Sequence, residues 1–429
     1  HYNFHWVLHF RNGAYILATV MTKYSKVIFA SFSPWEKGKR SPTNGLIEPM
    51  ISYFSPKVSK FILIDQPHPG SDRLIPRIET YNKGKYKGTS KSSLIVSFLY
   101  PFLILQNRLK TSIVFKIRDF LSVIDFGLRS KDHFDLFIGL ESINALAGVV
   151  LKKMGHVKTV VYYVSDFSLQ RYNNSWLNKV YLFLDHIAFN NSDFIWDISS
   201  AMMPARTKLG LKLNENKTSL HVPIALFDDQ IPTKKNLQTI PYSLVYAGLV
   251  NAENGPDLAI EVLKRVARIF PKTQLHIFAA GQDVEIQNLR DLTNKLSVQN
   301  KVFIHGLITN QTELINDLSQ FKIGLAPYVS KKNSARWWSD STRIRLYLVA
   351  GLPVITTQVP PMGKELIDNK SGLVVNDNAA QLSNAVITLF KNSILYNKMK
   401  VNAVKQAQNN TWDKVYTRTL KFMNVELKK

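Results

Sequence analysis

The stretch Phe321–Val354, FKIGLAPYVSKKNSARWWSDSTRIRLYLVAGLPV, has the pattern of a buried strand, a polar loop, a short helix and a second strand. The apolar run Ile323–Pro327 predicts the first strand, and Gly351-Leu352-Pro353 predicts a helix stop before the next one. Asp340 or Ser341 is expected to cap the helix, so that free backbone N–H groups face the loop. This arrangement predicts an anion site, and phosphate is the commonest small anion at such a site.

Three arginines crowd the same turn, namely Arg336, Arg343 and Arg345. Positions 343 and 345 point about 160° apart around a helix, so their side chains cannot easily reach one phosphate. Arg343 is nearer the helix N-terminus and is the preferred ligand for a phosphate. Arg345 is expected to be a solvated surface residue, and it stays with Arg336 as a weaker candidate.

Apolar runs alternate with helical patterns along the 429 residues, a length that predicts two domains of about 200 residues. Such alternation predicts α/β domains with doubly wound parallel sheets, whose ligands gather at the carboxyl ends of the strands. In the first half the strand candidates are residues 26–32, 59–65, 134–140, 159–166, 193–199 and 219–226. The predicted divisions are a first domain over 1–227, a linker with two prolines over 228–241, a second domain over 242–385 and helices over 386–429.

The beginning of the chain predicts an incomplete first domain. Residues 14–23 have the pattern of a first helix, and Val27–Phe32 that of a second strand. The first strand is therefore expected before His1, with residues 1–6 forming the loop after it.

Composition excludes several classes of site. The chain has no cysteine, so disulfides and thiolate metal sites are excluded. Histidine clusters with metal spacing, a GxSxG elbow, a Walker loop and an HExxH motif are also absent, which removes the commoner hydrolases and NTPases. The longest apolar run, Ser93–Leu105, falls short of the roughly 18 residues that span a bilayer, and it suits an interfacial or buried helix.

The formal net charge of +24 needs a partner or a structural reason. Residues 1–120 contain 18 Lys and Arg against 6 Asp and Glu, and several of these cations directly precede the apolar run: Lys83, Lys85, Lys87 and Lys91. A basic run beside an apolar segment predicts attraction to an anionic membrane surface. A solvated basic surface is the alternative, and nucleic acid is not expected because no nucleic-acid fingerprint accompanies the lysines.

Four longer strings resemble glycosyltransferases of the GT-B fold, in which two Rossmann-like domains face a cleft. They are residues 190–210 (NNSDFIWDISSAMMPARTKLG), 254–281 (NGPDLAIEVLKRVARIFPKTQLHIFAAG), 350–375 (AGLPVITTQVPPMGKELIDNKSGLVV) and 411–420 (TWDKVYTRTL). The resemblance implies that the second domain binds a nucleotide-sugar. It also implies that the last helix crosses back to the N-terminal domain.

Within that fold, the retaining group 1 family carries two glutamates eight positions apart, where this chain has Trp338 and Leu346. A closer resemblance is to the membrane-associated inverting β-glucuronosyltransferases of xanthan assembly. That resemblance implies that Asp166, at the end of VVYYVSDF, is the general base, and that Tyr328 of GLAPY stacks near the uracil. Leu307 stands where that family has a donor-binding glutamate.

The same resemblance implies that the helix start Asp340-Ser341-Thr342-Arg343 contacts the nucleotide, with Arg343 or Arg345 replacing a lysine. Gly248 ends the first strand of the second domain, where it either allows a donor phosphate to approach or only relieves a tight turn. Trp337 and Trp338 either stack a sugar or pack.

Two further assignments depend on the predicted cleft. Asp166 is favoured as a base over the alternative of a helix cap. The loop that contains His1, His5 and Arg11 should face the cleft, where these side chains could contact acceptor or donor, although the fraying of chain ends argues against such a role.

The expected function is transfer of a sugar from a nucleotide donor, UDP-linked, to a lipid-linked or polysaccharide acceptor, with inversion and without a metal ion or other cofactor. The expected location is the cytoplasmic side of the plasma membrane, as a peripheral protein. A retaining glycosyltransferase, a nucleotide-sugar epimerase and an inactive sugar-binding relative are the alternatives.

Overall fold

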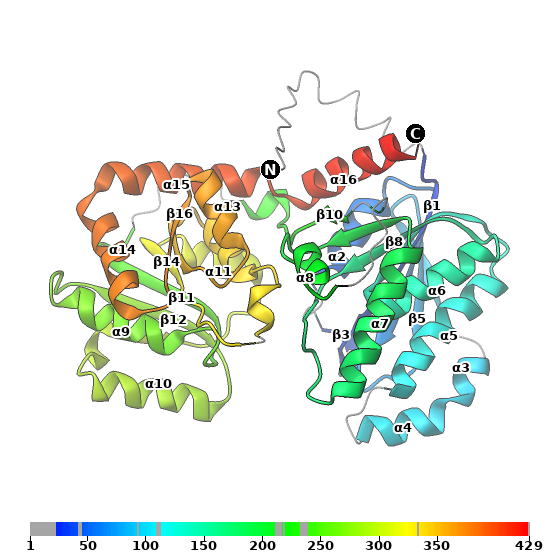
Figure 1. Ribbon diagram of the computed structural model, residues 1–429, viewed down its shortest axis with the longest axis horizontal. Helices are drawn as coiled ribbons and strands as arrows, with labels where there is room; N and C mark the ends of the chain where they lie inside the picture. The colour runs from blue at the N-terminus through cyan, green and yellow to red at the C-terminus, as the bar shows by residue number, and fades with distance from the viewer. Residues whose placement is uncertain are drawn as a thin grey trace.

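The computed structural model describes residues 23–41, 45–91, 94–108, 113–210, 217, 219–231, 239–332 and 334–427. The expected helix over 14–23 lies almost wholly outside these residues, as do His1, His5, Arg11 and half of the expected linker, residues 232–238. The described chain forms two α/β domains (Figure 1).

The N-terminal domain is built on an eight-stranded sheet in the order β10-β9-β8-β7-β1-β4-β5-β6. Its strands are β1 (Lys26–Ser33), β4 (Lys60–Pro67), β5 (Arg77–Asn82), β6 (Lys85–Lys91), β7 (Phe134–Leu140), β8 (Val157–Val164), β9 (Phe194–Asp197) and β10 (Ser219–His221). β1 is central and pairs in parallel with β4 and β7. Both edges of β1 are therefore paired with another strand, and the expected strand before His1 stays a prediction.

Helices cover this sheet, and a small hairpin of β2 (Trp35–Glu36) and β3 (Lys39–Arg40) follows β1. The helices are α2 (Ile47–Phe54), α3 (Leu94–Phe98), α4 (Tyr100–Arg108), α5 (Ile113–Arg129), α6 (Glu141–Lys153), α7 (Ser175–Asn191) and α8 (Met202–Lys208). Each of the six predicted strand segments overlaps a strand of this sheet. The antiparallel β5–β6 hairpin was not predicted, because its lysines and Gly88 conceal the apolar alternation of a strand.

The C-terminal domain has a six-stranded parallel sheet in the order β13-β12-β11-β14-β15-β16. The strands are β11 (Ser243–Leu249), β12 (Gln274–Ala280), β13 (Val302–His305), β14 (Ile323–Ala326), β15 (Val354–Thr357) and β16 (Gly372–Val375). In chain order this is the 3-2-1-4-5-6 arrangement of a dinucleotide-binding fold. Its topological switch point lies between β11 and β14, where a ligand is expected.

The helices that connect successive strands of this domain are α9 (Pro256–Ala267), α10 (Asp283–Lys295), α11 (Gln311–Leu318), α12 (Thr342–Val349) and α13 (Met362–Asn369), and α14 (Ala379–Lys391) follows the last strand, β16. The stretch Phe321–Val354 therefore forms β14, a loop, α12 and the start of β15, as predicted.

Two helices complete the chain, α15 (Ser393–Gln408) and α16 (Trp412–Glu426). Figure 1 shows α16 over the N-terminal domain, beside α2. Trp412 and Tyr416 are buried in the core of that domain, where Tyr416 contacts Tyr53 and Trp196. The predicted GT-B architecture, with a last helix that crosses back, is confirmed.

Candidate functional site

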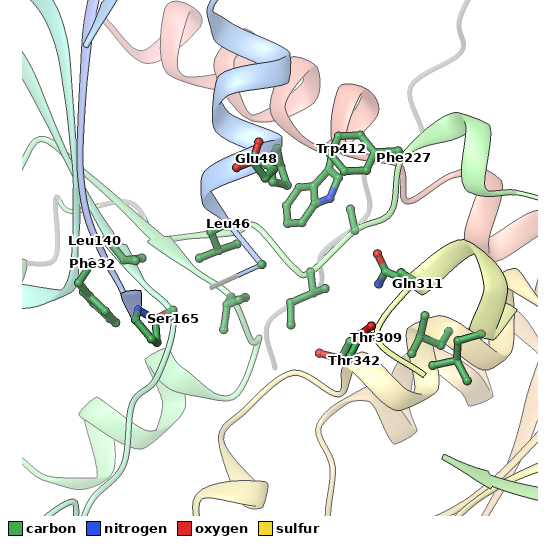
Figure 2. Close-up of a pocket in the computed structure, with 18 of the residues that line it drawn as sticks. Phe32, Leu46, Glu48, Leu140, Ser165, Phe227, Thr309, Gln311, Thr342 and Trp412 are labelled. Carbon is green, nitrogen blue, oxygen red and sulfur yellow. The ribbon is translucent and has the colours of Figure 1, made fainter. Parts of the chain in front are cut away.

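A cavity of about 840 Å³ lies between the two domains and has a mainly apolar lining. Figure 2 shows Phe32, Leu140 and Ser165 of the N-terminal domain on one side, and Thr309 and Thr342 of the C-terminal domain on the other. The carboxyl ends of β1, β7 and β8 therefore face the start of α12 across one space.

A second cavity, of about 270 Å³, lies in the C-terminal domain at the switch point between β11 and β14. Its lining contains nearly all the predicted donor residues, namely Gly248, Tyr328, Asp340, Ser341, Thr342 and Arg343, together with Arg336. Leu307, Thr342 and Leu346 line both cavities, so the two spaces adjoin.

The start of α12 forms one wall of this second cavity. Ser341 is the N-cap, and its Oγ accepts a hydrogen bond from the N–H of Ile344 at 3.3 Å. The hydroxyl groups of Tyr328 and Ser341 lie 2.6 Å apart, which ties the cap to the end of β14. Because helix geometry leaves first-turn N–H groups without intrahelical partners, this end of α12 can bind an anion.

Arg343 lies beneath the cavity and binds the protein itself. Its Nε donates to the carbonyl of Ala247 at 2.6 Å, Nη1 to that of Asn254 at 3.1 Å, and Nη2 to the hydroxyl of Tyr246 at 2.9 Å. The guanidinium carbon lies 4.1 Å from the ring centroid of Tyr246 and 4.9 Å from that of Tyr328. Three of its five N–H groups are therefore used inside the domain.

Gly248 gives Arg343 the space for these contacts. Its φ is +140°, and a Cβ at this position would lie 2.7 Å from Nη2 of Arg343. Burial raises the pKa of Tyr246 to about 12, so its hydroxyl stays neutral and can accept from Arg343 while it donates to the carbonyl of Leu249. In this structure the space beside Gly248 therefore holds an arginine.

The expectation that Arg345 is solvated is wrong. Its side chain is 4% exposed and forms ion pairs with Asp340 at 3.2 Å and Glu365 at 2.8 Å. Asp340 is also buried, and it accepts a hydrogen bond from the N–H of Ile224, in the segment that joins the domains. Burial raises the pKa of Asp340, whereas Arg345 opposes this shift.

Arg336 is the cation of this cavity with the fewest protein contacts. It lies in the short turn η3 (Ala335–Trp337), is half-buried, and its guanidinium carbon is 6.0 Å from the ring centroid of Tyr328. Among the described residues, no carboxylate forms an ion pair with it.

The neighbouring tryptophans pack, which was one of the two roles considered for them. Trp337 donates its Nε1–H to the carbonyl of Lys331 and packs against the C-terminal core. Trp338 packs against the core of the N-terminal domain.

Asp166 lies two residues beyond β8, and its side chain is 52% exposed. Its Oδ2 is 3.2 Å from Nη1 of Arg171, which also donates to the Asp166 carbonyl at 2.9 Å. The alternative that Asp166 caps the next helix is wrong, because Asn174 is the N-cap of α7. Asp166 is thus an accessible carboxylate beside Ser165, which lines the cleft.

Glu141, which sequence reasoning missed, lies directly behind Asp166. It follows β7 and has a left-handed backbone with φ of +65°. Its carboxylate accepts hydrogen bonds from Ser165 and from the N–H of Asp166. The only available signal was its place at the end of a predicted strand, because nothing local in the sequence reveals the contact with residues 165 and 166.

Part of the chain matches a known family. Residues 241–392 match the family described as "Glycosyl transferases group 1". None of the curated proteins matches the chain.

Several solved structures have a similar fold. HepE of Anabaena, in complex with UDP, is 12% identical with a TM-score of 0.63 and covers 93% of this chain and 100% of its own. The sucrose-phosphate synthase of Thermosynechococcus elongatus is 11% identical with a TM-score of 0.65, covering 94% and 99%. TarM of S. aureus is 13% identical with a TM-score of 0.53, covering 82% of this chain and 64% of TarM.

At these identities the structural matches show the fold, whereas the family match concerns the C-terminal domain. That domain is of the glycosyltransferase group 1 type, and the prediction of a transferase-type enzyme is confirmed. The finer resemblance to xanthan-type glucuronosyltransferases stays a prediction.

Proposed function

We propose that this protein transfers a sugar from a UDP-linked donor to a hydroxyl of a lipid-linked or polysaccharide acceptor, with inversion at the anomeric carbon. The observation that carries the proposal is that one cleft adjoins the cationic pocket at the switch point of the C-terminal domain and is lined, on its other side, by Ser165. Asp166, whose carboxylate is accessible, is the next residue along the chain. Structures of the similar HepE contain UDP, UDP with glucose, or UDP-glucose, which supports a UDP-sugar as donor.

The diphosphate would bind at the start of α12, where the hydroxyl groups of Ser341 and Thr342 and the first-turn N–H groups meet Arg336. Arg343 would add positive charge from below, with its remaining N–H groups. The ring of Tyr328 lies within 6.0 Å of both guanidinium carbons, and contact with the uracil is the further role that the resemblance implies. These groups can balance the charge of the leaving diphosphate, so we propose a reaction that needs no metal ion.

In the reaction the acceptor oxygen attacks the anomeric carbon, and the bond from that carbon to the diphosphate oxygen breaks. Asp166 takes the proton of the acceptor hydroxyl, and UDP leaves with the electron pair. Leu346 and Trp338 stand where a retaining enzyme of this fold has its glutamates, which favours the inverting course.

We expect Arg336→Ala to weaken UDP binding about tenfold or more, because the substitution removes a charge-assisted hydrogen bond to the diphosphate and leaves the rest of the pocket in place. The thermal unfolding midpoint should stay within about 1 °C of wild type, since Arg336 has few protein contacts. Titration calorimetry with UDP would measure the first effect, and Arg290→Ala, on exposed α10, is the matched control. Unchanged UDP affinity would remove Arg336 from the donor site.

A thermal-shift panel of UDP-, GDP- and dTDP-sugars tests the proposed donor, and a UDP-release assay with and without acceptor tests the reaction. A preference for UDP-sugars and acceptor-dependent release support the proposal. Turnover of donor without acceptor would favour an epimerase. Failure to bind any nucleotide would favour an inactive sugar-binding relative.

We also propose that the N-terminal domain binds an anionic membrane surface through α3, α4 and the start of α5. Five large apolar side chains there are exposed: Phe98, Phe102, Leu105, Ile113 and Ile117. Phe98 is the last residue of α3, and Phe102 and Leu105 lie three residues apart on α4. These exposed apolar side chains thus come from two consecutive short helices, which suits a surface that enters the lipid interface. Within the described residues, no helix is long and apolar enough to cross a bilayer.

The basic run is less compact than its sequence suggests. Lys85 and Lys91 are the two ends of β6, about 20 Å apart, so the exposed Lys83 and Lys85 lie at the end of the hairpin away from α3. Arg108, by contrast, is exposed at the end of α4 itself. Apolar insertion would therefore carry more of the binding than the lysines.

Replacing Phe98, Phe102 and Leu105 together by serine should reduce binding to phosphatidylglycerol vesicles about tenfold or more, because each buried apolar side chain contributes on the order of 1–3 kcal/mol. Vesicle sedimentation would measure this loss. The control replaces Ile394, Val401 and Val284 by serine, since all three are exposed on the other domain. Removal of Lys83, Lys85, Lys87 and Lys91 should weaken binding less and lower its dependence on salt. Unchanged binding of the apolar variant would refute this membrane face.

A further inference from the structure

Glu141 has a backbone conformation that side chains rarely adopt. It is the first residue of α6, directly after β7, and its φ of +65° lies in the left-handed region. Strained residues of this kind persist only where surrounding contacts hold them, and they concentrate at functional sites.

The contacts all come from the end of β8. Oε1 of Glu141 accepts from the N–H of Ser165 at 3.0 Å, from Oγ of Ser165 at 2.6 Å and from the N–H of Asp166 at 3.2 Å. One carboxylate oxygen thus fixes two successive residues of the turn in which Asp166 lies. Because a single oxygen accepts all three hydrogen bonds, the contact restrains the backbone of both residues.

The titratable groups around Glu141 come from three parts of the N-terminal domain. Asp166 and Arg171 come from the loop after β8, Tyr162 from β8 itself and Tyr181 from α7. Burial raises the pKa of Glu141, Arg171 opposes the shift, and the neighbouring charge of Asp166 adds to it. Arg171 pairs directly with Asp166, so it attracts both carboxylates.

We propose that Glu141 is a positioning residue for the reaction: its strained backbone and its carboxylate hold the Ser165–Asp166 turn, and with it Asp166, at the edge of the cleft that Ser165 lines. This inference rests on the proposed function, with Asp166 as the base. A residue that acts in this way should affect the chemical step and leave donor binding unchanged. A residue that only stabilises the fold should affect the unfolding temperature.

Three substitutions separate these roles. Glu141→Gln keeps a side-chain oxygen for Ser165 and Asp166 but removes the charge, and it should lower kcat about tenfold. Glu141→Ala removes the contacts, and Glu141→Gly also relieves the left-handed backbone; both should lower kcat by about 100-fold, within the range of acid–base contributions. For all three, the KM for the donor and the affinity for UDP should stay within about twofold of wild type.

The glycine variant is the decisive one. Glycine relieves the backbone strain, so the unfolding temperature of Glu141→Gly should be no lower than that of Glu141→Ala, although its activity is lost. A merely structural role would not produce two further results. One is a higher kcat for Glu141→Gln than for Glu141→Ala, and the other is a shift of the acid limb of the kcat–pH profile in Glu141→Gln. Lys153→Ala, at the exposed end of α6, is the control.

Failure of this inference can be distinguished from failure of the proposed function. If Asp166→Asn is inactive while Glu141→Gly and Glu141→Ala keep wild-type kcat and pH profiles, the positioning role is overturned and the base remains. If Asp166→Asn is fully active, the assignment of the base is overturned, and the positioning role falls with it.

Discussion

Asp166→Asn should lose glycosyl transfer by about 10²- to 10⁴-fold, because an amide cannot take the proton of the attacking hydroxyl. The affinity for UDP should be unchanged, since the donor pocket lies in the other domain. The stability should change little, because the side chain is half exposed and its pairing with Arg171 is a surface contact. Rates of UDP release with acceptor, together with UDP titrations, would measure both quantities.

A matched control is Asp368→Asn, which alters another exposed aspartate that is paired with a cation, Lys364, on the C-terminal domain. Transfer at the wild-type rate by Asp166→Asn would show that another group is the base. Loss of UDP binding in the same variant would instead indicate a disturbed fold.

Arg343→Met should destabilise the C-terminal domain by about 3 kcal/mol or more, because buried acceptors that lose their donor cost roughly 1–3 kcal/mol each. The groups left without this donor are the carbonyls of Ala247 and Asn254 and the hydroxyl of Tyr246. For a domain of this size the unfolding midpoint should fall by roughly 6–12 °C. UDP binding should fall as well, because Arg343 lines the cavity in which UDP is proposed to bind.

Differential scanning calorimetry of the full chain would measure this shift, and Arg336→Ala is the internal comparison. The two arginines line the same cavity, but only Arg343 is used by the fold. A midpoint within 1 °C of wild type for Arg343→Met would contradict the structural role described here. A second test is Arg343→Lys, which keeps the charge but cannot reproduce the three contacts.

Much of the fold could be predicted, because it depends on patterns that are local in the chain. The run from Ile323 to Val354 shows its strand, capped helix and next strand through apolar periodicity and a helix stop, and the structure has all three. The β5–β6 hairpin was missed because an edge strand with exposed lysines lacks that periodicity.

The candidate site was predicted less completely, because its details depend on contacts between distant residues. Arg345 was expected in solvent, yet it pairs with Glu365, 20 residues away, and no local pattern indicates that partner. Helical geometry did predict that Arg343 and Arg345 would point apart, and they share no hydrogen-bonding partner among the described residues. Glu141 was missed because its contact with Ser165 crosses 24 positions.

The place of α16 has a consequence for the order in which the chain can fold. Its buried residues Trp412, Tyr416, Leu420 and Met423 belong to the core of the N-terminal domain, although the whole C-terminal domain is synthesised before them. During synthesis on the ribosome, the part of the N-terminal core that α16 covers therefore stays exposed until α16 has been made. Residues 241–391 can form their own sheet before that point. The usual order of co-translational folding, in which the N-terminal domain matures first, is thus reversed for the final packing step.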